Sequence, residues 1–156
     1  MKKHKWMLAA TAVILIQMAV ILYLLMPETC KRTEVSNLQV QTTELISFTD
    51  VDYGADGLLE YEVSVHQDDV QVAMPFRTVI QQYHKGDWYD LQAKHRLSAA
   101  PVVAYNAREL NSYNWYDVNS VYGALRPGKY RMIKDVYVEK DSKLQKYVVA
   151  YEFTVK

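Results

Sequence analysis

The chain has 156 residues, and its 18 Lys and Arg balance 18 Asp and Glu, so it carries no formal net charge. Nucleic-acid-binding proteins need a concentrated basic face, and this balance argues against that class. Cys30 is the only cysteine, which excludes an intrachain disulfide. The 13 tyrosines against 3 phenylalanines are unusual, and tyrosine is typical of half-buried strands and exposed faces.

The first element along the chain is a hydrophobic segment that follows a basic start. Residues 1–5 contain three lysines, and the 21 residues of Trp6–Met26 carry no formal charge. A helix of that length covers about 30 Å, the hydrocarbon thickness of a bilayer. Lysines before the span favour a cytoplasmic N-terminus. We therefore expect a cytoplasmic start at 1–5, a single-pass cell-membrane anchor at 6–26, and all later residues on the extracytoplasmic face.

Two alternatives compete with an uncleaved anchor. A signal peptide has an apolar region of about 7–15 residues and a small-residue cleavage site, and Leu24–Cys30 offer no such site. Lipidation at Cys30 would need small residues directly before it, where the chain has Pro27–Thr29. Cys30 could instead link two copies into a disulfide dimer, although an inert thiol beside the membrane is the simpler interpretation.

The remaining chain divides into a polar stalk at residues 27–37 and one domain at 38–156. Alternation of apolar and polar residues in 59–65 and 147–155 is typical of strands with one wet face. Further strands are predicted at 38–48 (with a bulge or break), 76–83, 88–93, 102–105, 113–118 and 130–138, with a hairpin turn at His84–Asp87. About seven or eight strands, and one short helix at most, predict an all-β, antiparallel immunoglobulin-like β-sandwich.

The segment Leu125–Arg131 is the most specific structural motif of the chain. Pro127 and Gly128 turn the backbone, and Tyr130 follows at the head of a strand. This arrangement fits a tyrosine corner, in which the hydroxyl bonds to upstream backbone. The residues that we expect to be mostly buried are Tyr61, Val63, Val65, Trp88, Leu91, Trp115, Leu125, Tyr130, Met132, Val149, Tyr151 and Phe153.

Four motifs together resemble a known family: Gly86–Tyr89, Tyr113–Tyr116, Gly123–Arg131 and Tyr151–Val155. They are similar to the bacterial immunoglobulin-like domains of membrane-attached surface proteins in Gram-positive, clostridia-like bacteria, over about residues 40–156. The resemblance implies an extracytoplasmic β-sandwich without catalytic activity, and it carries over no active-site residue. It implies structural roles for Trp88, Trp115, Leu125, Pro127, Gly128, Tyr130 and Phe153.

Catalytic and metal-binding patterns are weak. A metal site would have to combine His66 with Asp68 or Asp69, and with His84, without helical or knuckle spacing. The three carboxylates of Asp50–Gly57 are irregularly spaced and lack the bidentate glutamate of a calcium loop, which favours an ordinary turn. No serine lies in a G-x-S-x-G or S-x-x-K motif. We expect no enzyme activity, cofactor or metal.

The excess of tyrosine favours a binding role instead. Tyrosine is enriched at protein interfaces, although rings that line the sandwich are the competing interpretation. The candidate interface residues are Tyr83, Tyr89, Tyr105, Tyr113, Tyr116 and Tyr122. We expect a membrane-anchored domain that contacts a protein or the cell envelope. The alternatives are an extracytoplasmic sensor or accessory subunit of a larger membrane complex, with Gln17 contacting a partner span, and a calcium-dependent adhesin.

Overall fold

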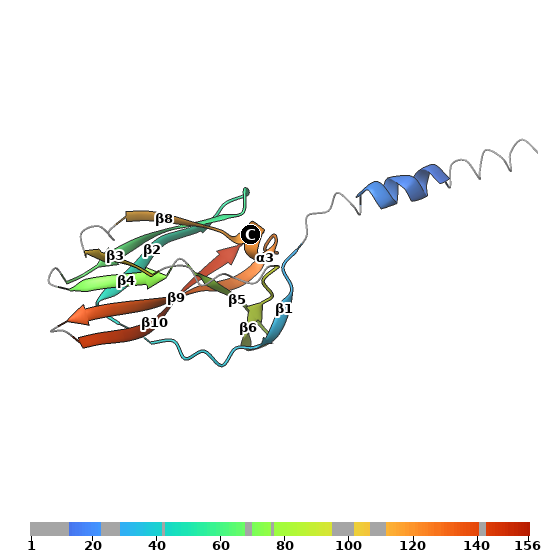
Figure 1. The fold of residues 1–156 in the computed structure, drawn as a ribbon. Helices are drawn as coiled ribbons and strands as arrows, with labels where there is room; N and C mark the ends of the chain where they lie inside the picture. Colours follow the sequence, from blue (N-terminus) through green and yellow to red (C-terminus); the bar gives the residue numbers. More distant parts are fainter. Residues whose placement is uncertain are drawn as a thin grey trace, which may run out of the picture.

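The computed structural model describes residues 13–22, 29–41, 43–67, 70–75, 77–94, 102–106, 112–140 and 143–156. Two antiparallel sheets are layered face to face (Figure 1). This arrangement confirms the predicted all-β, antiparallel sandwich.

The strands divide unequally between the two sheets. The small sheet has the order β2-β3-β8 and consists of β2 (Ile46–Tyr53), β3 (Leu58–Val65) and β8 (Ser112–Asp117). The large sheet has the order β1-β6-β5-β9-β4-β7, and β10 also pairs with β9. Its strands are β1 (Arg32–Val35), β4 (Gln71–Pro75), β5 (Val79–His84), β6 (Asp87–Leu91), β7 (Val102–Asn106), β9 (Gly128–Lys140) and β10 (Lys143–Val155). A five-residue helix, α3 (Val118–Tyr122), follows β8.

The long strand β9 organises the large sheet. β10 pairs along its whole length, so β4 and β5 must share its other edge, where they pair with different halves. Val79 follows Ala73 by six residues, but their partners on β9, Ile133 and Tyr137, are only four residues apart, so the chain has two extra residues between β4 and β5. Lys134 lies on β9 opposite this bulge.

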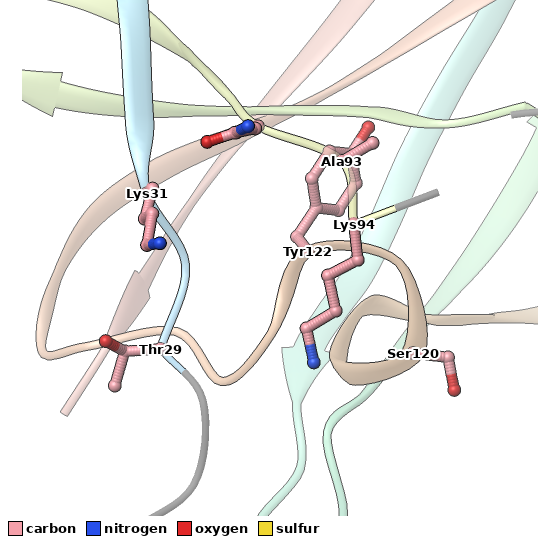
Figure 2. A pocket seen from close by; sticks show the side chains of 7 residues that line it. Thr29, Lys31, Ala93, Lys94, Ser120 and Tyr122 are labelled. Atoms are coloured by element: carbon pink, nitrogen blue, oxygen red, sulfur yellow. The ribbon is translucent and has the colours of Figure 1, made fainter. Parts of the chain in front are cut away.

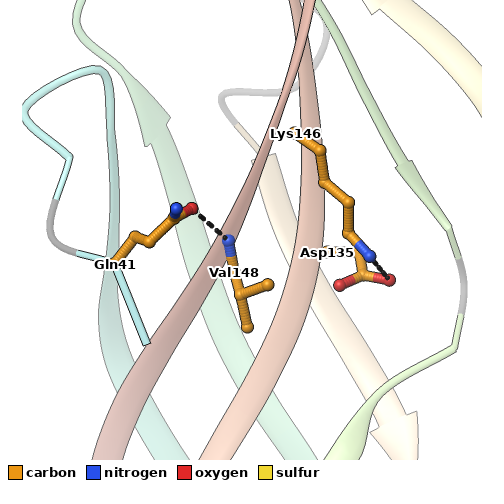
Figure 3. A network of polar contacts seen from close by, with 4 residues as sticks. All are labelled: Gln41, Asp135, Lys146 and Val148. Carbon is orange, nitrogen blue, oxygen red and sulfur yellow. Dashed lines mark hydrogen bonds and ion pairs between the residues drawn. The ribbon is translucent and has the colours of Figure 1, made fainter. Parts of the chain in front are cut away.

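The predicted stalk at residues 27–37 is only partly correct, because Arg32–Val35 form β1 and pair with β6. The chain then crosses the large sheet to its other edge. There the Gln41 N–H donates to the carbonyl of Val148 at 2.8 Å, and the Val148 N–H donates to Gln41 Oε1 at 3.2 Å (Figure 3). Beside this contact Lys146 forms an ion pair with Asp135 at 3.0 Å (Figure 3). Open strand edges offer unpaired backbone groups, and this is why polar residues join the sheet here.

Most of the predicted core is confirmed. Nine of the expected residues are buried: Tyr61, Val63, Val65, Leu91, Leu125, Tyr130, Met132, Val149 and Phe153. Trp88 and Tyr151 are half-buried. The prediction for Trp115 is wrong, because its side chain is 65% exposed.

The β5–β6 turn agrees with the prediction, whereas two elements of the structure were not predicted. Lys85 (φ 51°) and Gly86 (φ 99°) form the predicted β5–β6 hairpin turn, and two central residues with positive φ match the right-handed twist of the strands. β4 and α3 were not predicted from the sequence. Asp117 caps α3 by accepting from the Ser120 N–H at 2.9 Å, and Gly123 ends it. Helices this short show no apolar periodicity, so only the capping residues could have signalled α3.

The strand predicted at 38–48 lies further along the chain, at Ile46–Tyr53. Its irregularity falls between Thr49 and Asp52, where Asp50 has a φ of 50°. A bulge of this kind shifts the alternation on which a period-two prediction depends.

The predicted anchor at 6–26 lies partly outside the described residues, which include only 13–22 of it. Those ten residues are helical, and all are exposed. In the described part of the chain, no helix has both the length and the apolar character needed to cross a membrane.

Candidate functional site

Strand β8 divides the Tyr113–Tyr116 motif between two environments. Tyr113 and Trp115 are 55% and 65% exposed, whereas Asn114 and Tyr116 are half-buried. Alternation along a strand sends neighbouring side chains to opposite faces. Tyr116 pairs with buried Leu59 and takes the inward position, so Trp115 must point outward. A period-two pattern alone does not say which of two adjacent aromatics faces the core.

Two rows of side chains cross the outer face of the small sheet. In one row Asp52 pairs with Glu60 and Glu60 with Trp115. In the other, Glu62 pairs with Tyr113. We call these five residues the acidic aromatic face.

The electrostatics of this face are negative. A hydrogen bond to Glu60, with burial and the nearby Asp52 and Asp56 carboxylates, raises the pKa of Tyr113 to about 12. The phenol therefore stays neutral at physiological pH. Exposed rings together with carboxylates can bind Lys or Arg side chains, through cation–π contacts and charge-assisted hydrogen bonds.

The other predicted interface aromatics lie elsewhere. Tyr83 is 41% exposed and packs against Trp88 with ring centroids 5.1 Å apart. Trp88 is also covered by the Arg131 guanidinium, 4.4 Å from its ring centroid, and by Lys129 at 5.7 Å. These cations belong to the chain itself, so the Trp88 ring on the large sheet already has cation–π partners within the domain. That cover also explains why Trp88 is half-buried without entering the core.

The remaining three tyrosines do not form a common surface. The prediction of Tyr122 as an interface residue is wrong: it is 4% exposed, and its hydroxyl donates to the carbonyl of Thr78 at 3.0 Å. Tyr89 is half-buried between Arg32, 5.9 Å from its ring centroid, and His84, with ring centroids 6.1 Å apart. The Tyr105 side chain lies outside the described part of the structure.

The predicted tyrosine corner is confirmed. Tyr130 is fully buried, and its hydroxyl donates to the Arg126 carbonyl at 2.8 Å while accepting from Gln82 Nε2 at 2.9 Å. Its ring stacks on Phe153, with centroids 5.8 Å apart. Burial, together with the nearby Cys30, raises the pKa of Tyr130. Leu125 is buried beneath the turn, whereas Pro127 is exposed.

Cys30 contributes to packing. It is half-buried against the core, and its N–H donates to the carbonyl of Ala124 at 3.1 Å. A thiol in this position is less accessible to a second chain than one on a free stalk.

The candidate metal ligands do not converge in the described residues, where no group of three His, Cys, Asp or Glu side chains could hold an ion. His66 Nε2 lies 2.9 Å from Ser47 Oγ. Asp56 Oδ1 accepts from the Leu58 N–H at 3.1 Å, as a turn residue does. Asp68 and Asp69 lie outside the described residues.

A polar cleft of about 670 Å³ lies between the start of β1, the end of β6 and α3 (Figure 2). Its lining includes Lys31, Lys94 and Tyr122. The Lys94 N–H donates to the Val121 carbonyl at 2.7 Å and holds one wall against α3. Lys31 precedes β1 and Lys94 follows β6, and the two side chains give the cleft a basic lining.

No protein-family model, curated protein or solved structure matches the chain.

Proposed function

We propose that the chain is a non-catalytic, membrane-anchored domain that binds a protein partner on the extracytoplasmic side through its acidic aromatic face. The observation that carries this proposal is the 65% exposure of Trp115 on β8, directly opposite Glu60. Large exposed aromatics are costly in water and are enriched at binding hot spots. The carboxylates of the face select a partner segment that carries Lys or Arg.

Further observations support a membrane anchor and an immunoglobulin-like arrangement of the strands, which we include in the proposal. Residues 13–22 form an exposed helix of apolar side chains in which only Gln17 is polar, and three lysines precede it in the sequence. The order β2-β3-β8 against β10-β9-β5-β6 corresponds to A-B-E against G-F-C-C′ of immunoglobulin-like sandwiches. Met132 follows the corner tyrosine by two residues, at the place where antibody domains carry a disulfide cysteine.

A second candidate function is an accessory subunit of a larger membrane complex. Gln17 favours it, because a polar side chain in an apolar helix can hydrogen-bond to a neighbouring span. In that case the acidic aromatic face would contact the extracytoplasmic part of the same complex.

Site-specific photo-crosslinking of the full chain in its own membranes tests the main proposal. A benzophenone amino acid replaces Trp115 in one sample and Leu144 in a matched control, because Leu144 is 67% exposed on β10, away from the face. We expect a discrete protein adduct from position 115 only, and we expect it to weaken in the Glu60→Gln/Glu62→Gln variant.

An adduct that forms equally from both positions, or that ignores the charge change, would contradict a binding surface at this face. A carbohydrate adduct without protein at position 115 would replace the protein partner with a cell-envelope glycan.

A further inference from the structure

A cavity of about 410 Å³ opens between the two sheets beside β8. Its walls include Tyr61 from β3, Trp115 and Tyr116 from β8, and Val121 from α3. Small-molecule sites have volumes of roughly 300–1,000 Å³ and mostly apolar, aromatic walls with a few placed polar groups. The cavity matches this description.

Lys134 supplies a polar group from the opposite sheet. It lies on the core face of β9, between buried Met132 and Val136, and is 3% exposed. Its ammonium is 3.4 Å from the Pro75 carbonyl at the bulge and 5.6 Å from the centroid of the Tyr61 ring. The bulge thus places a lysine head group among the aromatic rings that line the cavity.

The other polar groups of the lining complete this picture. The Tyr116 hydroxyl is buried and lies beside the phenol of Tyr122. Asp117 also lines the cavity, but its carboxylate accepts from the Ser120 N–H at 2.9 Å and the Ser120 hydroxyl at 2.5 Å. The Asp117 carboxylate is therefore engaged in capping α3. Lys134 is the cation of the lining, and Tyr116 is one of its phenols.

We propose that this cavity binds a small anion with a planar apolar body, such as an aromatic carboxylate. The rings of Tyr61 and Tyr116 would contact the body, and the Lys134 ammonium would bind the anionic group. The cavity adjoins the acidic aromatic face, because Tyr113 and Trp115 also line it, but Tyr61 and Lys134 are buried and do not belong to that face.

Calorimetric titration of the full chain in neutral detergent micelles tests the proposal, with empty micelles as the blank. The probe is 2-naphthoate, and the control probe is 2-naphthamide, which has nearly the same shape without the charge. The variant is Lys134→Met, and its matched control is Lys146→Met, at an exposed lysine on β10. We expect Lys134→Met to weaken naphthoate binding about tenfold or more, since a buried ion pair is lost. Naphthamide binding and the Lys146→Met protein should be unaffected.

A pH series on the unaltered chain provides an independent readout if Lys134→Met fails to fold. Burial lowers the pKa of Lys134 to about 8. The tyrosines of the lining have raised pKa values, with Tyr61 and Tyr113 at about 12, and the pKa of Asp117 is lowered. Lys134 is therefore the lining group that loses its charge just above neutrality, and naphthoate affinity should fall between pH 7 and pH 9.5 while naphthamide affinity stays level.

Naphthoate that fails to bind, binds Lys134→Met equally well, or keeps its affinity at pH 9.5 would overturn the proposal.

Discussion

The hydroxyl of Tyr130 donates a 2.8 Å hydrogen bond to the carbonyl of Arg126, four residues upstream. This bond closes the turn before β9 and fixes the point at which this 13-residue strand of the large sheet begins. Gln82 on β5 donates to the same hydroxyl, so the corner also ties two strands together.

Removal of the corner hydroxyl should destabilise the fold. Tyr130→Phe leaves the Arg126 carbonyl and the Gln82 amide without this partner, and we expect a loss of about 1–3 kcal/mol in unfolding free energy. Tyr130→Ala also removes the buried ring and should cost about 3–5 kcal/mol. Urea denaturation checks both values. Tyr147→Phe is the control, because its hydroxyl donates to the exposed side chain of Gln145; equal effects at both positions would contradict the role of the corner.

Gly57 and Gly86 should respond differently to alanine. Both have positive φ, 87° and 99°, which costs about 1 kcal/mol in any non-glycine residue. A Cβ on Gly57 would also lie 1.9 Å from Asn119 Nδ2, whereas one on Gly86 meets nothing within 4 Å. We expect Gly57→Ala to lower the unfolding free energy by a further 1–3 kcal/mol, roughly the cost of overpacking. Equal losses for the two variants in chemical denaturation would refute the contact with Asn119.

Lys134→Met should stabilise the protein at neutral pH. The folded-state pKa of Lys134 is about 8, below its ordinary 10.5, because burial disfavours the charge. Below pH 8 both states carry the proton and the folded state bears the full desolvation cost. Between pH 8 and 10.5 the folded state releases the proton first, so stability rises with pH in the native chain.

The methionine variant should therefore gain up to about 3 kcal/mol at pH 7, and this gain should vanish near pH 10.5. Thermal and urea unfolding across this range measure it. Lys146→Met, which breaks the exposed pair with Asp135, should change stability by less than about 1 kcal/mol. A Lys134→Met protein less stable than the native chain at pH 7 would show that the contacts of the ammonium outweigh its desolvation.

Trp115 was predicted to be buried and Tyr122 to lie at an interface, but the structure places them the other way round. Substitution of Tyr122 should therefore destabilise the fold, whereas substitution of Trp115 should not. Trp115→Ala removes an exposed ring and should change the unfolding free energy by no more than about 0.5 kcal/mol. Tyr122→Phe removes a buried bond to the Thr78 carbonyl and should cost about 1–3 kcal/mol. Urea midpoints distinguish the cases, and a large loss at Trp115 would mean that its ring supports the fold.

Gln17 should matter only if the helix contacts another span. Gln17→Leu should reduce co-purification of membrane partners from detergent extracts, because it removes the polar group available for an interhelical bond. Met18→Leu is the matched apolar control on the next residue. Unchanged recovery of partners with Gln17→Leu would weaken the accessory-subunit function.

Local chemistry along the chain was enough to predict several features. The alternation in β3, the positive-φ turn at Lys85 and Gly86, and the Pro127–Gly128 turn before Tyr130 each depend on neighbouring residues alone. These features led to the all-β sandwich and to most of its core before any long-range contact was known.

Pairing between distant segments decided the rest. Trp115 faces outward because Tyr116 takes the position opposite Leu59. Residues 32–35 of the predicted stalk form β1 because they pair with the edge of β6. Lys134 enters the core face because β9 alternates through it, while the bulge after β4 brings the Pro75 carbonyl to its ammonium. Backbone preferences along the chain are thus sufficient to predict most of the strands, the β5–β6 turn and the corner, but not β1, β4 or the bounds of β2. The buried face of each strand, and the meeting of charged side chains with aromatic rings, depend on register between residues far apart in the chain, and this register exists only in the folded protein.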